Sequence, residues 1–343
     1  MKKLVLSLAI IAFATSCSNV DDDTIIDEIP QAEKPYSNGI IICNEGNFQS
    51  SNAEISFIKN DLSTVYNNIF ALNNSNATLG DVAQFIGFNN DLAYIVMNNS
   101  NTIEIVNRYT FKKVNQISQE LNQPRAIAFS NGKIYVTNAN NNTVAVYNAT
   151  TNTFIKTIAL DNQPEKLVAT SNYVYVQSSS YSTTGNTIEI INSSSDTNTK
   201  DLTFALPMNG ITIDSNMIFV IGSDVNKTEI SKIENEAVTK TITSNTLKSS
   251  RYLTLDNGNL YFTNGTGIFT LSKDLNNIPS APLFNVSDNS WSTLFGFNVI
   301  DGKVFSSDAN GFTDNSIITI YDLSGNVLKT FTTEIGTNGF YKN

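Results

Sequence analysis

"GKIYVTNANNNTVAVYNATTNTFIKTI", the stretch from Gly132 to Ile158, contains three apolar runs separated by two polar, Asn-rich turns. Related stretches recur along the chain, among them "LAYIVMNNSNTIEIVN" around Tyr94, "YVYVQSSS" around Tyr175 and "GNLYFTNGTGIFTLSK" around Tyr261. The units follow one another at roughly 40–45 residues, the period of proteins that build each propeller blade from four strands. Seven copies therefore predict an all-β fold, a seven-bladed β-propeller of four-stranded blades.

The strands and turns within a unit follow from local patterns. In "NTIEIVN" (101–107) and "NTVAVYN" (142–148) apolar and polar residues alternate, which predicts strands with one face toward a neighbouring blade. Asn-Gly at 131–132 and Asp-Gly at 301–302 predict tight hairpins, because both residues of each pair tolerate a positive φ.

The ring is expected to close through its C-terminal strand. Most units contain a further run, such as "PRAIAFS" from 124 or "SRYLTLD" from 250, which we assign to the innermost strand of a blade. The first unit, which begins near Gly39, has no such run before it, whereas the chain ends with "TNGFYKN" (337–343). Since an open ring leaves unpaired strand edges, the C-terminal strand is predicted to complete the N-terminal blade.

Composition limits the function. The 343 residues are 41% hydrophobic and 15% charged, as in a folded domain, and the formal net charge is -10. Such acidity argues against nucleic-acid binding, which needs a basic surface.

The chain contains no histidine. A Ser-His-Asp triad, a histidine metal ligand and an imidazole base are therefore excluded, and we expect a binding protein rather than an enzyme, without a cofactor. Asp308, Asn310 and Asp314 offer oxygen ligands for calcium, but they are too few for a complete site, so a simple polar loop is the favoured interpretation and no metal is expected.

The N-terminus is interpreted as a processing segment. Residues 1–16 combine two lysines, an apolar run and small residues, as in a signal peptide. Their junction with Cys17 resembles the lipobox of bacterial lipoproteins, in which the cysteine is acylated; an ordinary secretory signal is the alternative. Residues 17–36 are acidic and aperiodic, which predicts a flexible tether before a propeller at 37–343. Cys43, in an apolar run, is expected to be a buried core residue without a disulfide.

The repeat resembles a known family. "IYVTNANNNTVAVYNATTNTFIKTI" (134–158) resembles the unit of YVTN-type seven-bladed propellers. "NEGNFQSSNAEISFI" (44–58) followed by "LGDVAQFI" (79–86) resembles one branch, surface lipoproteins that accompany TonB-dependent transporters. This resemblance implies an outer-membrane location, a TonB-dependent transporter as partner and a nutrient as ligand; cobalamin (vitamin B12) is the ligand of the best understood members.

Three residues stand out as ligand-binding candidates on one face of the ring. In a propeller, the loops leading into the innermost strands and the loops joining second to third strands surround the same end of the central funnel. Arg125 and Arg251 occupy equivalent positions at the start of innermost strands, and Trp291, the only tryptophan, lies in the loop before the following one. Arginine offers a planar set of donors and tryptophan a large rigid face. The alternatives are that the arginines pair with carboxylates of neighbouring blades and that Trp291 packs between blades.

The loops between second and third strands contribute further candidates, rich in Asn, which carries both donors and an acceptor. Each of these Asn residues has an alternative role in forming its turn. The predicted ligand-binding residues of these loops are Asn47, Phe48, Asn98, Asn138, Tyr181 and Phe312.

The resulting hypothesis is a cell-surface lipoprotein that binds a corrinoid-like nutrient on one propeller face and passes it to a TonB-dependent transporter. The alternative is a scaffold or adhesin that docks other surface proteins or glycans.

Overall fold

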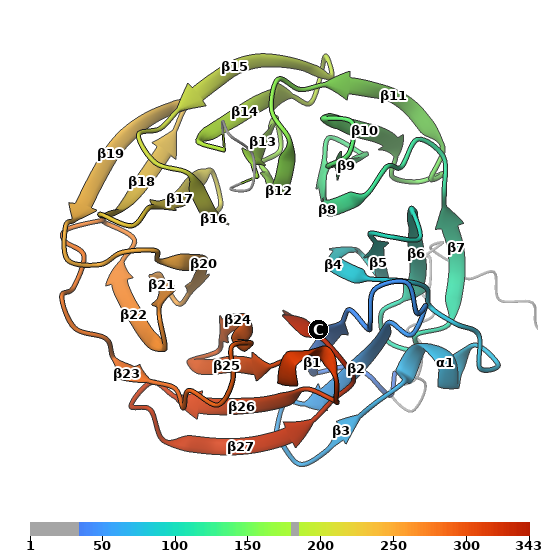
Figure 1. Ribbon diagram of the computed structural model, residues 1–343. Helices are drawn as coiled ribbons and strands as arrows, with labels where there is room; N and C mark the ends of the chain where they lie inside the picture. Colours follow the sequence, from blue (N-terminus) through green and yellow to red (C-terminus); the bar gives the residue numbers. More distant parts are fainter. Residues whose placement is uncertain (1–33, 180–184) are drawn as a thin grey trace, which may run out of the picture.

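The computed structural model describes residues 34–179 and 185–343, which form seven four-stranded antiparallel sheets. The sheets are arranged as blades around a central opening, with one strand of each blade lining it and the others following outward (Figure 1). The seven-bladed β-propeller predicted from the repeat is confirmed.

We number the blades in chain order and give the strands of each from the innermost to the outermost. Blade 1 contains β28 (Thr337–Lys342), β1 (Gly39–Asn44), β2 (Glu54–Lys59) and β3 (Val65–Tyr66). Blade 2 contains β4 (Ala83–Asn89), β5 (Leu92–Met97), β6 (Thr102–Asn107) and β7 (Lys113–Ile117). Blade 3 contains β8 (Pro124–Ser130), β9 (Lys133–Asn138), β10 (Thr143–Asn148) and β11 (Phe154–Ala159). Blade 4 contains β12 (Pro164–Ala169), β13 (Tyr173–Ser178), β14 (Thr187–Asn192) and β15 (Thr197–Thr203).

Blade 5 contains β16 (Met208–Asp214), β17 (Met217–Ser223), β18 (Thr228–Glu234) and β19 (Ala237–Ser244). Blade 6 contains β20 (Arg251–Asp256), β21 (Asn259–Asn264), β22 (Gly267–Ser272) and β23 (Phe284–Asn285). Blade 7 contains β24 (Thr293–Ile300), β25 (Lys303–Asp308), β26 (Ile317–Asp322) and β27 (Val327–Thr332). A short helix, α1 (Ile69–Asn73), and a 3-10 turn, η2 (Asn310–Phe312), lie in connecting loops. Among the described residues, no helix is both long and apolar enough to cross a membrane.

The ring closes as predicted. The C-terminal strand β28 pairs antiparallel with β1, so that Ile41 lies opposite Tyr341. Phe340 of the same strand is 1% exposed, and the Thr337 hydroxyl donates to the Asn44 side chain at 2.6 Å. The two ends of the described chain are therefore joined within one sheet, which leaves no strand edge between the first and last blades.

The core consists of apolar side chains between neighbouring blades, for example Tyr94 and Val96 of blade 2 with Ile134 and Val136 of blade 3. Second and third strands are buried on both faces, whereas the alternation predicted only one face toward a neighbour. The reason is that each blade is packed between two others. Even Glu104, at an alternate polar position, is only 3% exposed and lies 2.8 Å from the Lys113 ammonium.

The predicted hairpins occur where expected. Asn131 and Gly132 have φ values of 48° and 69°, and Asp301 and Gly302 have 50° and 70°. Two successive residues in the left-handed region give the turn whose twist matches that of the flanking strands.

The structure describes one of the two cysteines, Cys43. Cys43 is free and fully buried in the core, as expected, whereas Cys17, the signal peptide and most of the tether lie outside the described residues. Where the described chain begins, the Tyr36 N–H donates to the Tyr109 carbonyl at 3.1 Å, in the loop between the third and outermost strands of blade 2. This loop lies at the opposite end of the strands from the loops that join second to third strands.

Candidate functional site

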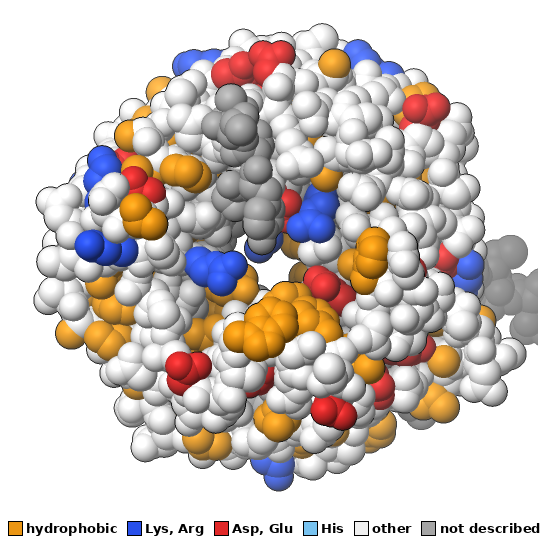
Figure 2. Space-filling model, in the orientation of Figure 1, with side chains coloured by type: hydrophobic (Ala, Val, Ile, Leu, Met, Phe, Trp, Pro, Cys, Tyr) orange, Lys and Arg blue, Asp and Glu red, His pale blue; other side chains and the backbone are white. Residues whose placement is uncertain are grey.

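The candidate site is the end of the ring that we call the mouth. It is formed by the loops leading into the innermost strands and the loops joining second to third strands. Both sets meet there, since the Trp291 ring in the loop before β24 lies 6.0 Å from the Phe312 ring in the loop after β25. Figure 2 shows the central opening on one face, bordered by basic, acidic and hydrophobic side chains.

A repeated backbone feature shapes the mouth. Each of the seven innermost strands has a register irregularity near its start, for example between Ala83 and Phe85 in β4 and between Pro124 and Ile127 in β8. A β-bulge leaves an extra residue unpaired and redirects its side chain. The half-buried residues at these bulges are polar or aromatic in every blade: Gln84, Arg125, Glu165, Lys166, Asn209, Tyr252, Phe295 and Asn338. We call them the bulge ring.

Arg125 connects three blades within the bulge ring. Its guanidinium donates to Glu165 of blade 4, with the closest N–O distance 2.5 Å, and to the Gln84 side chain of blade 2 at 2.7 Å. Of the two roles considered for Arg125, the structure therefore contains the ion pair with a neighbouring blade. Its geometry fixes the guanidinium and neutralises much of its charge.

Glu45 lies beside this pair in the loop after β1. Asn338 donates to its carboxylate at 2.7 Å and to the Ala83 carbonyl at 3.0 Å, which joins blades 1 and 2. Burial raises the pKa of Glu45 to about 7; the Asn338 hydrogen bond and Arg125 oppose this shift, while Glu165 adds to it. Near neutral pH the carboxyl group is therefore only partly ionised.

Lys166 and Arg251 are the other two cations at the mouth end of the innermost strands. Neither has an ion pair within the described parts of the chain, in contrast to Arg125. The Lys166 ammonium lies 6.0 Å from the centroid of the Tyr252 ring, and burial lowers the pKa of this lysine, with Glu165 opposing the shift. Arg251 is exposed at the start of β20. In Figure 2 basic groups border the opening over β8 and over β20.

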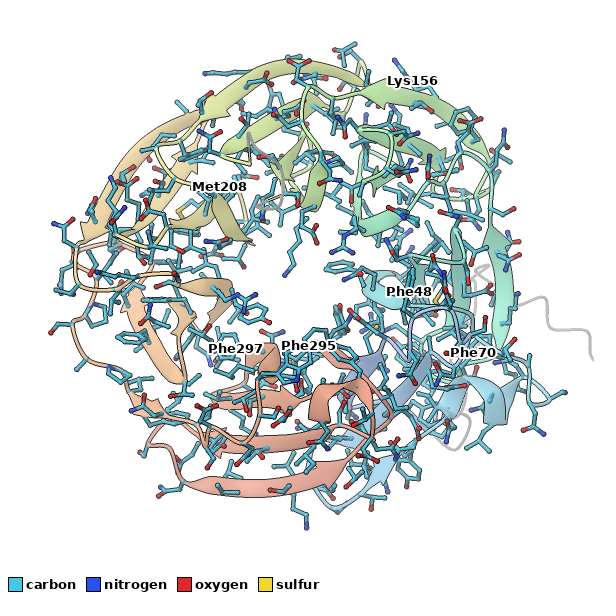
Figure 3. All side chains as sticks on the ribbon, viewed as in Figure 1. Phe48, Phe70, Lys156, Met208, Phe295 and Phe297 are labelled. Carbon is cyan, nitrogen blue, oxygen red and sulfur yellow. The ribbon has the colours of Figure 1, made fainter. Side chains whose placement is uncertain are left out.

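An aromatic rim lies against the bulge ring in blade 7. Trp291 is 79% exposed, and Phe312 contacts both it and the Phe295 ring, which is 4.8 Å away edge to face. Figure 3 places Phe295 beside the central opening. The Asn47 amide of blade 1 donates to the Phe312 carbonyl at 2.6 Å. Trp291 thus does not pack between blades; it presents its indole to solvent on a fixed loop.

Asp308 organises this loop. It accepts hydrogen bonds from Ser290 at 2.6 Å, from Ser292 at 2.8 Å and from the Asn310 N–H at 2.9 Å. Burial alone would raise the pKa of Asp308, but these donors outweigh it and lower the pKa. The donors use the oxygens that calcium would need, which agrees with the simple polar loop. Within the described residues, no group of three or more acidic, cysteine or histidine side chains is placed to hold a metal ion.

The remaining predicted ligand-binding residues differ in their exposure and in their hydrogen bonds. Phe48 is 65% exposed, and Figure 3 places it over blade 2, outward of the innermost strand β4. The Asn98 amide donates to the Pro124 carbonyl at 3.0 Å, and Asn138 is fully buried and donates to the Glu120 carbonyl at 3.0 Å. The amides of these two Asn residues therefore hold other loops of the mouth in place, that of Asn98 across to the neighbouring blade. Tyr181 lies outside the described residues.

Sequence reasoning identified Arg125 but missed Lys166, Tyr252 and the remaining members of the bulge ring. Aligned innermost strands would have indicated several of them, since "AQFI" (83–86), "PRAI" (124–127), "PEKL" (164–167) and "TNGF" (337–340) each have a polar second residue. The mouth offers amide, guanidinium, ammonium and carboxyl groups beside an exposed aromatic surface. It is suited to binding an organic molecule by hydrogen bonds and stacking.

Known structures share the propeller architecture at low sequence identity. A quinonprotein alcohol dehydrogenase-like protein from Bacteroides thetaiotaomicron is 15% identical, with a TM-score of 0.66 over 87% of this chain and 76% of that one. A functionally unknown protein from Desulfotomaculum acetoxidans is 14% identical, with a TM-score of 0.65 over 89% and 98%. Hydrazine synthase of Kuenenia stuttgartiensis is 14% identical, with a TM-score of 0.59 over 73% and 85%. Because the fold occurs in enzymes too, these similarities extend to the fold alone.

No curated protein sequence matches the chain. A family profile does match, over residues 38–294, which include all strands of blades 2 to 6 and the beginning of blade 7. The chain therefore belongs to the family described as a domain of unknown function, DUF5074.

Proposed function

We propose that the protein is a cell-surface lipoprotein that binds a large, amide-rich nutrient of the corrinoid class at the mouth and passes it to a TonB-dependent outer-membrane transporter. The observation that carries the proposal is Trp291. Its indole is 79% exposed, yet it is held on a loop ordered by Asp308. Exposed apolar surface of this size is unfavourable in water unless a ligand covers it.

The bulge ring supports the same ligand class. Its amides and charged groups come from rigid strands, and many are already fixed by contacts such as that of Arg125 with Gln84. Each neutral hydrogen bond contributes only about 0.5–1.5 kcal/mol net, so tight binding requires several donors and acceptors in place before the ligand arrives. A corrinoid carries many amides around its ring, which can pair with such donors and acceptors.

Binding without catalysis is part of the proposal. The sequence has no histidine, and the raised pKa of Glu45 belongs to a carboxyl group that is hydrogen-bonded by Asn338 on a propeller strand.

The proposed location requires a tether that reaches the membrane. The chain joins the ring near Tyr36, at the end opposite the mouth. Twenty residues between Cys17 and this point span at most about 70 Å when extended. That length is enough for a lipid-anchored propeller to present its mouth either away from the membrane or toward a neighbouring transporter.

Titration calorimetry tests the ligand. The soluble chain, residues 37–343, is titrated with cyanocobalamin, and a siderophore and an oligosaccharide serve as comparators. We expect saturable binding of cyanocobalamin that is weakened in Trp291→Ala and in Arg251→Ala and unchanged in Val114→Ala, an exposed apolar residue on the outermost strand β7.

The outcomes separate the rival functions. Preferential binding of the oligosaccharide would favour an adhesin, and the absence of any small-molecule binding at micromolar concentration would favour a docking scaffold. Binding of cyanocobalamin that is unaffected by both mouth variants would place the ligand on the opposite face.

A further inference from the structure

Two cations at the central opening have no ion-pair partner. At the mouth end of the innermost strands the chain places Arg125, Lys166 and Arg251, apart from Lys227 and Lys248 in the outer loops. Arg125 is neutralised by Glu165 at 2.5 Å. No carboxylate of the described residues forms an ion pair with Lys166 or Arg251.

Lys166 is in an unfavourable environment when no ligand is bound. It is half-buried, and its ammonium faces the Tyr252 ring rather than an anion. The ring is itself fixed, because the Tyr252 hydroxyl donates to the Leu294 carbonyl at 2.9 Å. An ammonium group that is partly removed from water without a paired anion is destabilised, in agreement with the lowered pKa of this lysine.

The nearby carboxyl groups do not pair with Lys166 or Arg251. Glu165 accepts hydrogen bonds from Arg125, and Glu45 accepts one from Asn338 instead of from a lysine or arginine. Because burial raises the pKa of Glu45 to about 7, this group carries only part of a negative charge at neutral pH. An anion from outside the chain is the partner that the mouth lacks.

We propose that Lys166 and Arg251 form an anion subsite in the mouth, so that the nutrient bound there has a phosphate or carboxylate group in addition to an apolar part that covers Trp291. The inference rests on the proposed function, since it assumes that the mouth binds a ligand, and it narrows the class of that ligand. The anion offsets the charge of Lys166 and accepts hydrogen bonds from the Arg251 guanidinium. The aromatic rim accepts the apolar part.

Matched probe pairs that differ only in the anion test the subsite. Flavin mononucleotide against riboflavin tests phosphate, and naphthylacetate against naphthylacetamide tests carboxylate. We expect the charged member of at least one pair to bind about tenfold more tightly to the purified protein, measured by calorimetry, because a charge-assisted hydrogen bond is stronger than a neutral one. The pair that discriminates identifies the kind of anion.

The double variant Lys166→Gln, Arg251→Gln is expected to bind both members of each pair equally. A control variant with two substitutions on the outer surface, Lys112→Gln with Lys329→Gln, removes the same net charge and should leave the discrimination intact. Lys166→Gln alone should keep or raise the melting temperature, because it removes an unpaired, half-buried charge. A lower melting temperature would mean that Lys166 is a structural residue and not a ligand-binding one.

Equal affinity within both pairs, the absence of binding by all four probes at millimolar concentration, or discrimination that persists in the double variant would each overturn the subsite. Failure of cyanocobalamin to bind, together with discrimination between the probes, would refute the corrinoid proposal and leave the anion subsite standing.

Discussion

Replacing Trp291 by alanine is the most direct test of the mouth. A tryptophan side chain has roughly 250 Å² of surface, so 79% exposure leaves about 200 Å² available to a ligand. A flat ligand covers one face, or about half of that area. At about 25 cal/mol per Å² this burial contributes about 2.5 kcal/mol. The variant should therefore bind between about tenfold and a hundredfold more weakly.

The same change should have little effect on folding. Trp291 contacts Phe312 at a ring distance of 6.0 Å and is otherwise largely in solvent, while Asp308 keeps its hydrogen bonds from Ser290 and Ser292. We expect the free energy of unfolding to change by less than about 1 kcal/mol. Affinity and stability should therefore separate in this variant.

Two measurements check this prediction. Calorimetry with cyanocobalamin gives the affinity, and intrinsic fluorescence of the parent reports on the mouth directly, because Trp291 is the only tryptophan in the chain. A change in affinity below roughly twofold, with binding by the parent intact, would refute the assignment of Trp291 to the ligand. Quenching of the parent's fluorescence by the ligand without an effect of Trp291→Ala on affinity would place the ligand near the rim but not on the indole.

Three further predictions address the anchor, the closure and the pH dependence. Cys17→Ala should abolish incorporation of a fatty-acid analogue, and labelling that persists would refute acylation at this residue. Deleting the residues after Phe331 removes β28, leaves β1 unpaired and exposes its partners, so the variant should lose cooperative thermal unfolding; a transition like that of the parent would contradict closure through this strand. Because burial raises the folded-state pKa of Glu45 to about 7, above its unfolded value, ionising this group costs stability increasingly as the pH rises from about 4 to 7. Glu45→Gln should therefore be more stable than the parent at pH 8, by at most about 3 kcal/mol, and closely similar at pH 4; equal melting temperatures at both pH values would refute the shift.

The fold was predictable because it is encoded in local patterns that repeat. Each unit contains the same order of apolar runs and turns. The first unit lacks an innermost strand and the run at 337–343 has no unit of its own, so the two belong to one blade. The burial of Glu104 was not predictable in this way. The alternation of residues around Glu104 predicts a strand with one exposed face. Only the stacking of blades on both sides of β6 encloses the Glu104 carboxylate beside Lys113.

The candidate site was less predictable, because its side chains depend on bulges that shift the register of each innermost strand near its start. Arg125 and Arg251 lie near the starts of innermost strands and looked equivalent in sequence. In the structure Arg125 is the unpaired residue of its bulge and reaches Glu165, whereas Arg251 pairs with Thr263 before its bulge and remains exposed. A one-residue difference in register thus separates an ion-paired arginine from one without a pair. Tyr252, at the bulge itself, takes the place that Arg125 has in blade 3.

The Asn side chains of the mouth loops have a structural role. Asn47, Asn98 and Asn138 use their amides to bond main-chain carbonyls at the mouth, and the first two bonds join neighbouring blades. Each such bond contributes only about 0.5–1.5 kcal/mol, but together they hold the loops in one arrangement. A mouth that is already ordered loses little conformational entropy when a ligand binds, so more of the interaction energy remains as affinity. These Asn bonds therefore help to hold the mouth rigid. In the proposed function, recognition falls to the groups that these bonds leave available, namely Trp291, Lys166 and Arg251.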